Sequence, residues 1–193
     1  MLKNLIFDWG GVCTYGHHLK DFSNNLSQKC DKSKEEIEKV FRDLDYPYET
    51  GQISPEEFWK NFSEQLNANI SIPEIRETFL NAYTLNQDVL NFIKTLRPQY
   101  RVVLFSNNYA DLFGHMKKIY ELNNYFDITL CSADIHHKKP EPEVYEYFIN
   151  ELKLNPAETL FIDDKEKNII PAHAAGFITH QFINLHELQK KLI

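Results

Sequence analysis

Five short runs of apolar and β-branched residues constrain the fold of this 193-residue chain more than any other feature. They are Leu5–Phe7, Val102–Phe105, Ile128–Cys131, Leu160–Ile162 and Phe177–Phe182. Segments with helical spacing separate the later runs, as in the apolar pair Val144 and Phe148. Alternating strands and helices are typical of a parallel sheet covered by helices on both faces. The sequence therefore predicts an α/β fold with one main core.

Residues 17–85 interrupt this alternation with three successive helix starts and no convincing strand. At each start a serine stands three residues before a glutamate, which is the spacing of a capping box. The pairs are Ser33 with Glu36, Ser54 with Glu57, and Ser71 with Glu74. The aromatic stripes that follow are interpreted as the core of a helical bundle rather than a cofactor site. We therefore predict an all-helical insertion over residues 17–85.

Charge and cysteine content narrow the classes of function and the compartment. The 21 Lys and Arg residues are outnumbered by 28 Asp and Glu residues, and the net charge of -7 disfavours binding to nucleic acid. No apolar run approaches the roughly 20 residues that cross a bilayer, so we expect no membrane partner. Cys13, Cys30 and Cys131 are odd in number and lack the spacing of a metal site, which favours a reducing, cytoplasmic setting.

Polar side chains follow three of the predicted strands at the point where each strand ends. Asp8 follows the first strand, Ser106 and Asn107 follow the second, and Asp163 and Asp164 follow the fourth. In a parallel sheet these positions share the carboxyl edge, where open α/β sheets bind ligands. One such aspartate means little, because Asp is a common turn residue. Three such positions together predict a binding site at this edge.

A lysine near the same edge completes a pattern that resembles the haloacid dehalogenase-like hydrolase superfamily over nearly the whole chain. Asp8 in FDWGGV is similar to the family's nucleophile. Ser106-Asn107 in VVLFSNN resembles the second motif, whose hydroxyl and backbone N–H groups hold the phosphate. Lys139 in KKPEPEVY matches the third motif, and a lysine there can neutralise a phosphoryl group that carries about -1.5 to -2 charges.

The fourth motif of the family is matched by Asp163-Asp164 with Asn168 in FIDDKEKN. From the residues alone, Asn168 is interpreted equally well as a helix cap. The resemblance implies a Rossmann-like parallel sheet core, the HAD fold, formed by residues 1–16 and 86–193. It also implies that residues 17–85 are a helical cap domain inserted after the first strand.

The expected chemistry is the Mg²⁺-dependent hydrolysis of a small phosphorylated metabolite, such as a sugar phosphate, through an aspartyl-phosphate on Asp8. Charge on a phosphate monoester repels nucleophiles, so cations must offset it before an aspartate attacks. Mg²⁺ prefers oxygen ligands, for which Asp8, Asp164 and the Gly10 carbonyl are candidates, together with Asp163. Lys139 and Mg²⁺ would balance the charge. The predicted partner is therefore a small phosphate ester, and the oligomeric state is left open.

Gly10 departs from the family pattern, because most phosphatases of the family carry an aspartate two residues after the nucleophile. That aspartate supplies proton transfer worth about 10²- to 10⁴-fold in rate. Candidates to replace this acid are His17, His18, His136 and Cys13. His136 stands where the third motif of the family often has glycine. One alternative to a phosphatase is a catalytically silent binding or regulatory protein. A second is a metal-free haloacid dehalogenase, which is less favoured because Asp163 and Asp164 would repel each other without a cation.

In the family the cap closes over the site and selects the leaving group. The candidates for this role in the insertion are His17, His18, Tyr46, Tyr48 and Glu49.

Overall fold

The computed structural model describes residues 1–16 and 18–192, and its centre is a parallel sheet of five strands in the order β5-β4-β1-β6-β7. The strands are β1 (Asn4–Phe7), β4 (Arg101–Ser106), β5 (Ile128–Cys131), β6 (Thr159–Asp163) and β7 (Ile178–Gln181). Every neighbouring pair in this sheet is parallel. The five predicted strands are confirmed, each end lying within one residue of its expected position.

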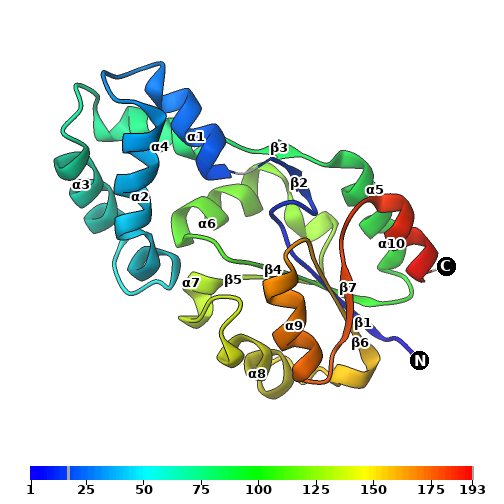
Figure 1. Cartoon of the computed structure of the whole chain (residues 1–193). Coiled ribbons are helices and arrows are strands. Elements are labelled where there is room, and N and C mark those ends of the chain that lie inside the picture. The colour runs from blue at the N-terminus through cyan, green and yellow to red at the C-terminus, as the bar shows by residue number, and fades with distance from the viewer. Residues whose placement is uncertain (17, 193) are drawn as a thin grey trace.

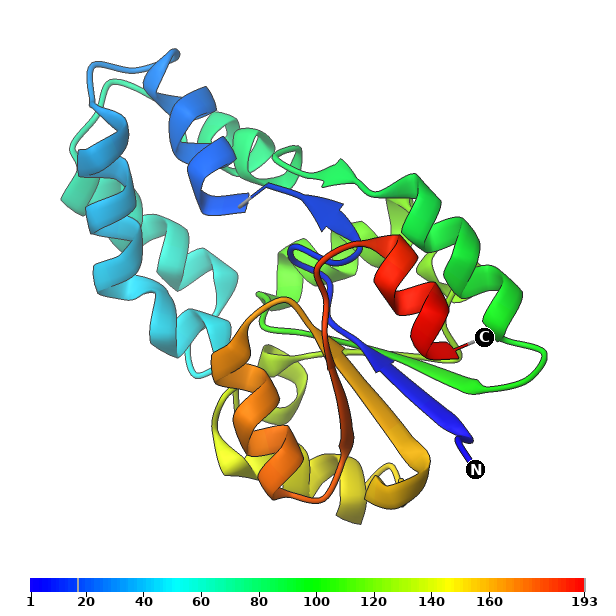
Figure 2. The same ribbon diagram turned by 45° about the vertical axis from the view of Figure 1, so that its right-hand side comes forward.

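Helices cover both faces of the sheet (Figures 1 and 2). They are α5 (Gln87–Leu96), α6 (Ala110–Ile119), α8 (Pro142–Asn150), α9 (Glu166–Ala174) and α10 (Leu185–Leu192). Leu5 and Phe7 of β1 pack in one core with residues of α5, α6 and α10, whereas Ile6 packs with residues of α8 and α9 in a second core. This division follows from the strand period of two, which points successive side chains to opposite faces. The predicted α/β architecture is therefore confirmed.

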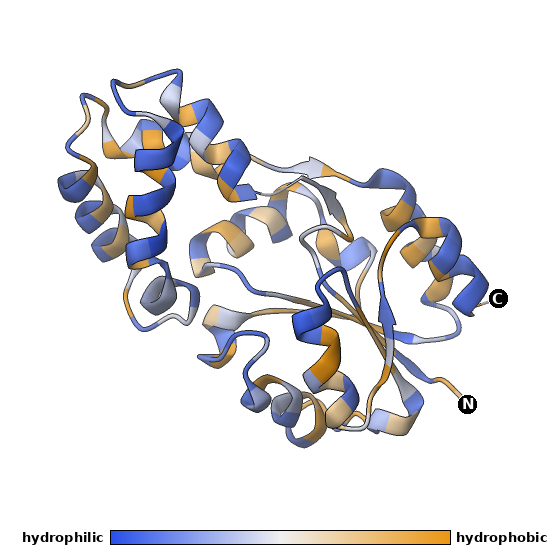
Figure 3. Ribbon diagram, in the orientation of Figure 1, coloured by the Kyte–Doolittle hydropathy of each residue, from blue (hydrophilic) through white to orange (hydrophobic). Residues whose placement is uncertain are grey.

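Four helices lie between β1 and α5 along the described chain, at one end of the molecule (Figure 1). They are α1 (His18–Ser27), α2 (Lys34–Glu49), α3 (Pro55–Leu66) and α4 (Ile72–Leu80). Ser33, Ser54 and Ser71 cap α2, α3 and α4, and the reciprocal glutamate bond forms at Ser33 and Ser71. The apolar faces of the helices meet inside the bundle (Figure 3), so the interpretation of the aromatic stripes as core is confirmed.

The structure differs from the sequence expectation at the two ends of this insertion. Helix α1 is an additional helix, and it begins without the serine–glutamate pair that marks the other three. Two short strands, β2 (Thr14–Tyr15) and β3 (Thr84–Leu85), pair in an antiparallel ribbon where the chain leaves and re-enters the sheet region. Strands of two residues are too short to produce a periodic pattern.

The remaining elements are α7 (Ser132–Ile135) and two short 3₁₀ turns, η1 (Leu122–Asn124) and η2 (Pro156–Glu158). Within residues 1–16 and 18–192, none of the helices combines the length and the apolar character that crossing a membrane requires.

Candidate active site

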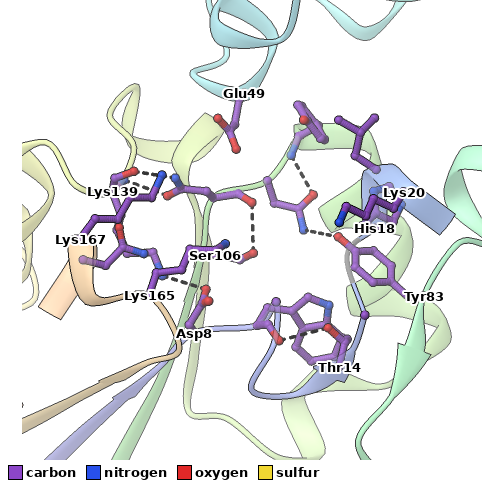
Figure 4. Close-up of a pocket in the computed structure, with 18 of the residues that line it drawn as sticks. Asp8, Thr14, His18, Lys20, Glu49, Tyr83, Ser106, Lys139, Lys165 and Lys167 are labelled. Carbon is purple, nitrogen blue, oxygen red and sulfur yellow. Dashed lines mark hydrogen bonds and ion pairs between the residues drawn. The ribbon is translucent and has the colours of Figure 1, made fainter. Parts of the chain in front are cut away.

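The carboxyl ends of three adjacent strands, β4, β1 and β6, bring the predicted polar residues together. Ser106 ends β4, Asp8 directly follows β1, and Asp163 ends β6. Asp8 and Ser106 line a cavity of about 450 Å³, into which residues from the helical bundle also project (Figure 4). This is the ligand-binding edge that is expected for an open parallel sheet.

Lys139 is buried beside this edge and connects two of its carboxylates. Its Nζ donates to Asp8 Oδ1 over 2.8 Å and to Asp163 Oδ2 over 2.7 Å. The Asn107 side chain fixes the lysine backbone, because it donates to the Lys139 carbonyl and accepts from the Lys139 N–H, each over 2.8 Å. Burial lowers the pKa of Lys139, but attraction to Asp163 and Asp8 outweighs burial and raises the pKa overall. Lys139 is therefore a fixed positive charge.

The three aspartates form a tight cluster whose candidate ligand oxygens lie within 4.8 Å of one another. Burial raises the pKa of Asp8 to about 6, although Lys139 partly opposes this effect. Burial also raises the pKa of Asp164. Asp163 differs, because Lys139 and hydrogen bonds from Lys165 N and Asn168 outweigh burial and hold its pKa below the usual value. The cluster thus contains two carboxylates, Asp8 and Asp164, whose ionised forms are not fully stabilised by the positive charges of the protein.

Asp164 shows where a cation would bind. Its Oδ1 is buried and has no hydrogen-bond partner in the part of the chain that the structure describes. A buried carboxylate oxygen without a partner is costly. A cation shared with Asp8 would satisfy it, whereas the oxygens of Asp163 already accept from Lys139, Asn168 and the Lys165 N–H. The donor set therefore fits a hard cation held mainly by Asp8 and Asp164.

The two glycines after Asp8 have different roles. Gly11 has a φ of +78°, and a Cβ there would lie 2.5 Å from Asp164 Oδ2, so only glycine lets the backbone approach this carboxylate. Gly10 lines the cavity, and a Cβ at this position would meet no atom within 4 Å. Gly10 thus leaves space at the position where the resemblance led us to expect an aspartate.

The loop between β4 and α6 offers donors for an anion. The Ser106 hydroxyl is buried at the cavity wall, and the Asn107 N–H has no acceptor among the described residues. Helix α6 begins at Ala110, and its N-terminus adds the positive end of a helix dipole. The Asn107 side chain, in contrast, is fully used in holding Lys139.

Asn168 does not cap a helix. Helix α9 begins at Glu166 with Lys165 as its N-cap, so Asn168 lies inside the first turn. Its Nδ2 donates to both oxygens of Asp163, over 2.9 and 3.0 Å. The cap interpretation is therefore wrong, because the side chain faces the sheet edge rather than the backbone of its own helix.

The residues proposed to replace the missing acid at Gly10 differ in their position relative to the cavity. His18 lines the cavity, and His17 lies outside the described residues. Cys13 is buried, its thiol donates to the Asp8 carbonyl, and burial raises its pKa well above the usual value. His136 bonds the Thr50 carbonyl through Nδ1, and its φ of +61° is the left-handed conformation that glycine adopts most easily.

Among the candidates for substrate selection, His18 and Glu49 line the cavity, whereas Tyr46 and Tyr48 bond to Glu141 and Asp111 away from it. Several lining residues were not singled out from the sequence. They are Trp9, Thr14, Gly16, Leu19, Lys20, Arg42, Tyr83, Asn108, Tyr109, Lys165 and Lys167. Asn108 adjoins the second motif and was within reach of sequence reasoning, but Tyr83 and Arg42 carry no local signal because the packing of the bundle brings them to the site.

Two proteins with similar sequences are named as phosphatases. A D-ribitol-5-phosphate phosphatase of Bacteroides thetaiotaomicron is 28% identical over 193 residues, which cover 94% of this chain and 92% of that protein. A sesquiterpene phosphatase of Aspergillus oryzae is 29% identical over 182 residues, covering 91% of this chain and 87% of that protein.

A solved structure and a family model also match this chain. The crystal structure of a haloacid dehalogenase family enzyme from Bacteroides thetaiotaomicron, in complex with magnesium and inorganic phosphate, matches with a TM-score of 0.82 at 26% identity. The match covers 97% of this chain and 99% of that one. The family model for haloacid dehalogenase-like hydrolases matches residues 2–176. Both the family and the fold were predicted from the sequence motifs, and this chain is a hydrolase of the haloacid dehalogenase-like family.

Proposed function

We propose that the protein is a Mg²⁺-dependent phosphatase that hydrolyses a small phosphorylated metabolite through an aspartyl-phosphate on Asp8. One observation carries the proposal: Asp8 lies at the cavity with one oxygen held by Lys139, within the cluster that contains the unpartnered Asp164 Oδ1. Asp8 is therefore oriented and close to a site for a cation. Similarity to two phosphatases and to an enzyme solved with magnesium and phosphate supports this function.

The residues fit Mg²⁺ through Asp8 and Asp164, with the Gly10 carbonyl as a third candidate ligand. Asp163 belongs to the same cluster, but we assign it to hold Lys139 and Asn168. When bound, Mg²⁺ would withdraw charge from the phosphoryl oxygens and orient them. It would also lower the pKa of Asp8, which burial otherwise raises, and so keep the nucleophile ionised.

The first step is attack of an Asp8 carboxylate oxygen on phosphorus. The new O–P bond forms as the bond to the alcohol oxygen breaks, and the alcohol leaves with a proton from water, because Gly10 has no side chain to supply one. Ser106 and the Asn107 N–H donate to the phosphoryl oxygens as negative charge builds up there, and Lys139 beside them supplies a positive charge. Water then attacks phosphorus as the bond between phosphorus and the Asp8 oxygen breaks. The proton of this water passes to the hydroxide that the first step left, and phosphate is released.

We also propose that residues 17–85 act as a cap domain on a core formed by residues 1–16 and 86–193. In this arrangement the core supplies the nucleophile and the phosphate site. The helical region supplies the contacts to the leaving alcohol. His18 and Glu49, which come from α1 and α2, support this division because both line the cavity of Asp8.

A catalytically silent binding protein is the second candidate, and the missing acid at Gly10 is the observation that favours it. The intact set of Asp8, Lys139 and Asp164 argues for turnover instead. Loss of an acid slows a reaction by about 10²- to 10⁴-fold without removing the nucleophile. A silent protein would bind phosphate esters but release no phosphate, so an activity assay separates the two candidates.

The test is phosphate release from a panel of sugar, polyol, aryl and nucleotide phosphates, with Mg²⁺ and then with a chelator. We expect hydrolysis that the chelator abolishes. Asp8→Asn should fold and lose turnover, because the amide keeps the volume but cannot attack phosphorus. The matched control, Asp43→Asn on the exposed surface of α2, should retain full activity. Substantial turnover by pure Asp8→Asn protein would refute the covalent mechanism.

A further inference from the structure

The helical side of the cavity holds two hydrogen-bond acceptors that lack a donor within the described part of the chain. One is Oε1 of Glu49, whose other oxygen is paired with Lys138. The second is Nδ1 of His18. Both residues line the cavity that contains Asp8. Figure 4 shows Glu49 entering from the bundle, on the side of the cavity opposite Asp8.

Glu49 is held in place by the core rather than by its own helix alone. Its side chain is only 13% exposed, and Lys138 Nζ donates to Oε2. Ser132 Oγ donates to the Glu49 carbonyl over 2.6 Å, and the same Oγ accepts from Asn108 N over 2.9 Å. These bonds join Glu49 to the loop that follows the phosphate motif. The carboxylate is therefore a preorganised acceptor and not a freely rotating surface group.

His18 is a neutral ring in a defined tautomer. Its Nε2 lies 2.8 Å from the Phe79 carbonyl, which can only accept, so Nε2 carries the hydrogen. Burial lowers the pKa of His18 to about 4, so Nδ1 remains an unprotonated acceptor near neutral pH. The ring is fixed by stacking on Tyr83, with ring centroids 4.2 Å apart.

Tyr83 adds a hydrogen-bond donor to these two acceptors. Its hydroxyl oxygen accepts from Asn108 Nδ2 over 3.3 Å, and its O–H has no acceptor among the described residues. This wall of the cavity thus presents two acceptors and one donor. An alcohol hydroxyl both donates and accepts, so it can satisfy each of these groups.

We propose that the leaving alcohol of the substrate carries further hydroxyl groups, that Glu49 is the specificity-determining residue that accepts from one of them, and that Lys138 is its positioning residue. The proposal rests on the proposed phosphatase function. It restricts the substrate class to phosphates of polyols and sugars, as opposed to apolar alcohols.

The hydrogen-bonding groups of this wall support the restriction. An ammonium group would meet Lys138 and could not accept from Tyr83. An apolar alcohol would leave Glu49 and His18 desolvated without donors, which is costly.

The experiment compares kcat/KM for ribitol 5-phosphate with kcat/KM for pentyl phosphate, which has the same carbon chain and no hydroxyl groups. In Glu49→Ala we expect the ratio of the two values to fall about 10- to 100-fold, the range for a lost hydrogen bond to a charged group. Glu49→Gln should lower the ratio less. Lys138→Met should act through KM for ribitol 5-phosphate more than through kcat. The control Glu35→Ala, on the exposed side of α2, should leave the ratio and both activities unchanged.

Binding measurements separate the inference from the proposed function. Calorimetry with Asp8→Asn protein, alone and combined with Glu49→Ala, gives the Kd ratio of the two compounds without turnover. Loss of selectivity in Glu49→Ala supports the inference even when the wild-type protein releases no phosphate, a result that would refute only the proposed function. An unchanged Kd ratio overturns the inference, as does an unchanged kcat/KM ratio in an active enzyme.

Discussion

Asp111 joins three helices of the bundle to the first turn of α6, so removing its carboxylate should strongly destabilise the fold. Its Oδ2 accepts from Arg76 Nη2 over 3.1 Å and from Trp59 Nε1 over 3.3 Å, and its Oδ1 accepts from the Tyr48 hydroxyl. The Asp111 side chain is only 14% exposed. One carboxylate on the core thus satisfies donors from α2, α3 and α4.

The size of the effect follows from what Asp111→Ala leaves behind. Tyr48 and Trp59 are each 1% exposed, so each would keep a buried donor without a partner, at about 1 to 3 kcal/mol apiece. Arg76 is 34% exposed and regains water, so its lost ion pair adds at most about 1 kcal/mol. We therefore expect the free energy of unfolding to fall by about 2 to 7 kcal/mol.

Urea titration followed by tryptophan fluorescence measures this loss. The matched control is Asp43→Ala, which breaks the Lys39–Asp43 pair, whose side chains are 77% and 55% exposed. It should cost at most about 0.5 kcal/mol. A double-mutant cycle between Asp111→Ala and Tyr48→Phe should give a coupling energy of about 1 kcal/mol or more. If Asp111→Ala costs no more than Asp43→Ala, the assignment of Asp111 as the main polar contact between bundle and core is wrong.

Three further predictions concern the cavity. Lys139→Ala should lower kcat/KM for an aryl phosphate about 10²- to 10³-fold, whereas Lys138→Ala should have a far smaller effect on this substrate, and equal losses in steady-state assays would contradict the assignment. The wild-type protein should favour sugar 1-phosphates and aryl phosphates over 6-phosphates in such assays, and Gly10→Asp, for which the structure has space, should narrow that gap. Because the folded pKa of His18 is about 4 and its unfolded value about 6.5, the unfolded chain binds a proton first as the pH falls, so His18 should cost about 2 kcal/mol of stability between pH 7 and 5. In urea titrations over the same pH range, the free energy of unfolding of His18→Gln should fall by about 2 kcal/mol less than that of the wild-type protein.

The strands β1, β4 and β6 were predictable from the sequence because each is buried on both faces and is followed by or ends in polar residues. The run Leu5–Phe7 has no polar interruption before Asp8, and its observed strand begins only one residue earlier. The ribbon of β2 and β3 was not predictable, because pairing of Thr14 with Leu85 depends on chain segments far apart in sequence. Helix α1 was missed because its start lacks the serine–glutamate pair that marks the starts of α2, α3 and α4.

The two sides of the cavity differ in how far local sequence determines them. Asp8, Ser106 and Asp163 stand at strand ends, so the parallel topology alone brings them together. Tyr83 and Glu49 reach the cavity only because the bundle packs on the core in one particular way. The sequence offered Glu49 as one of five candidates in the insertion, and only the packing distinguishes it from Tyr46 and Tyr48.

The segment from Ser132 to Lys139, which consists of α7 and the loop that follows it, connects the two sides of the cavity. Lys139 turns toward Asp8, and the preceding residue, Lys138, turns the opposite way toward Glu49. Ser132, at the other end of the segment, bonds both the Glu49 carbonyl and the N–H of Asn108. A shift of this segment would move the lysine that holds Asp8 and the proposed hydroxyl acceptor together. Under the proposed function, selection of the leaving alcohol and stabilisation of the phosphoryl group would be mechanically coupled, and a substitution in the segment that relaxes one should weaken the other.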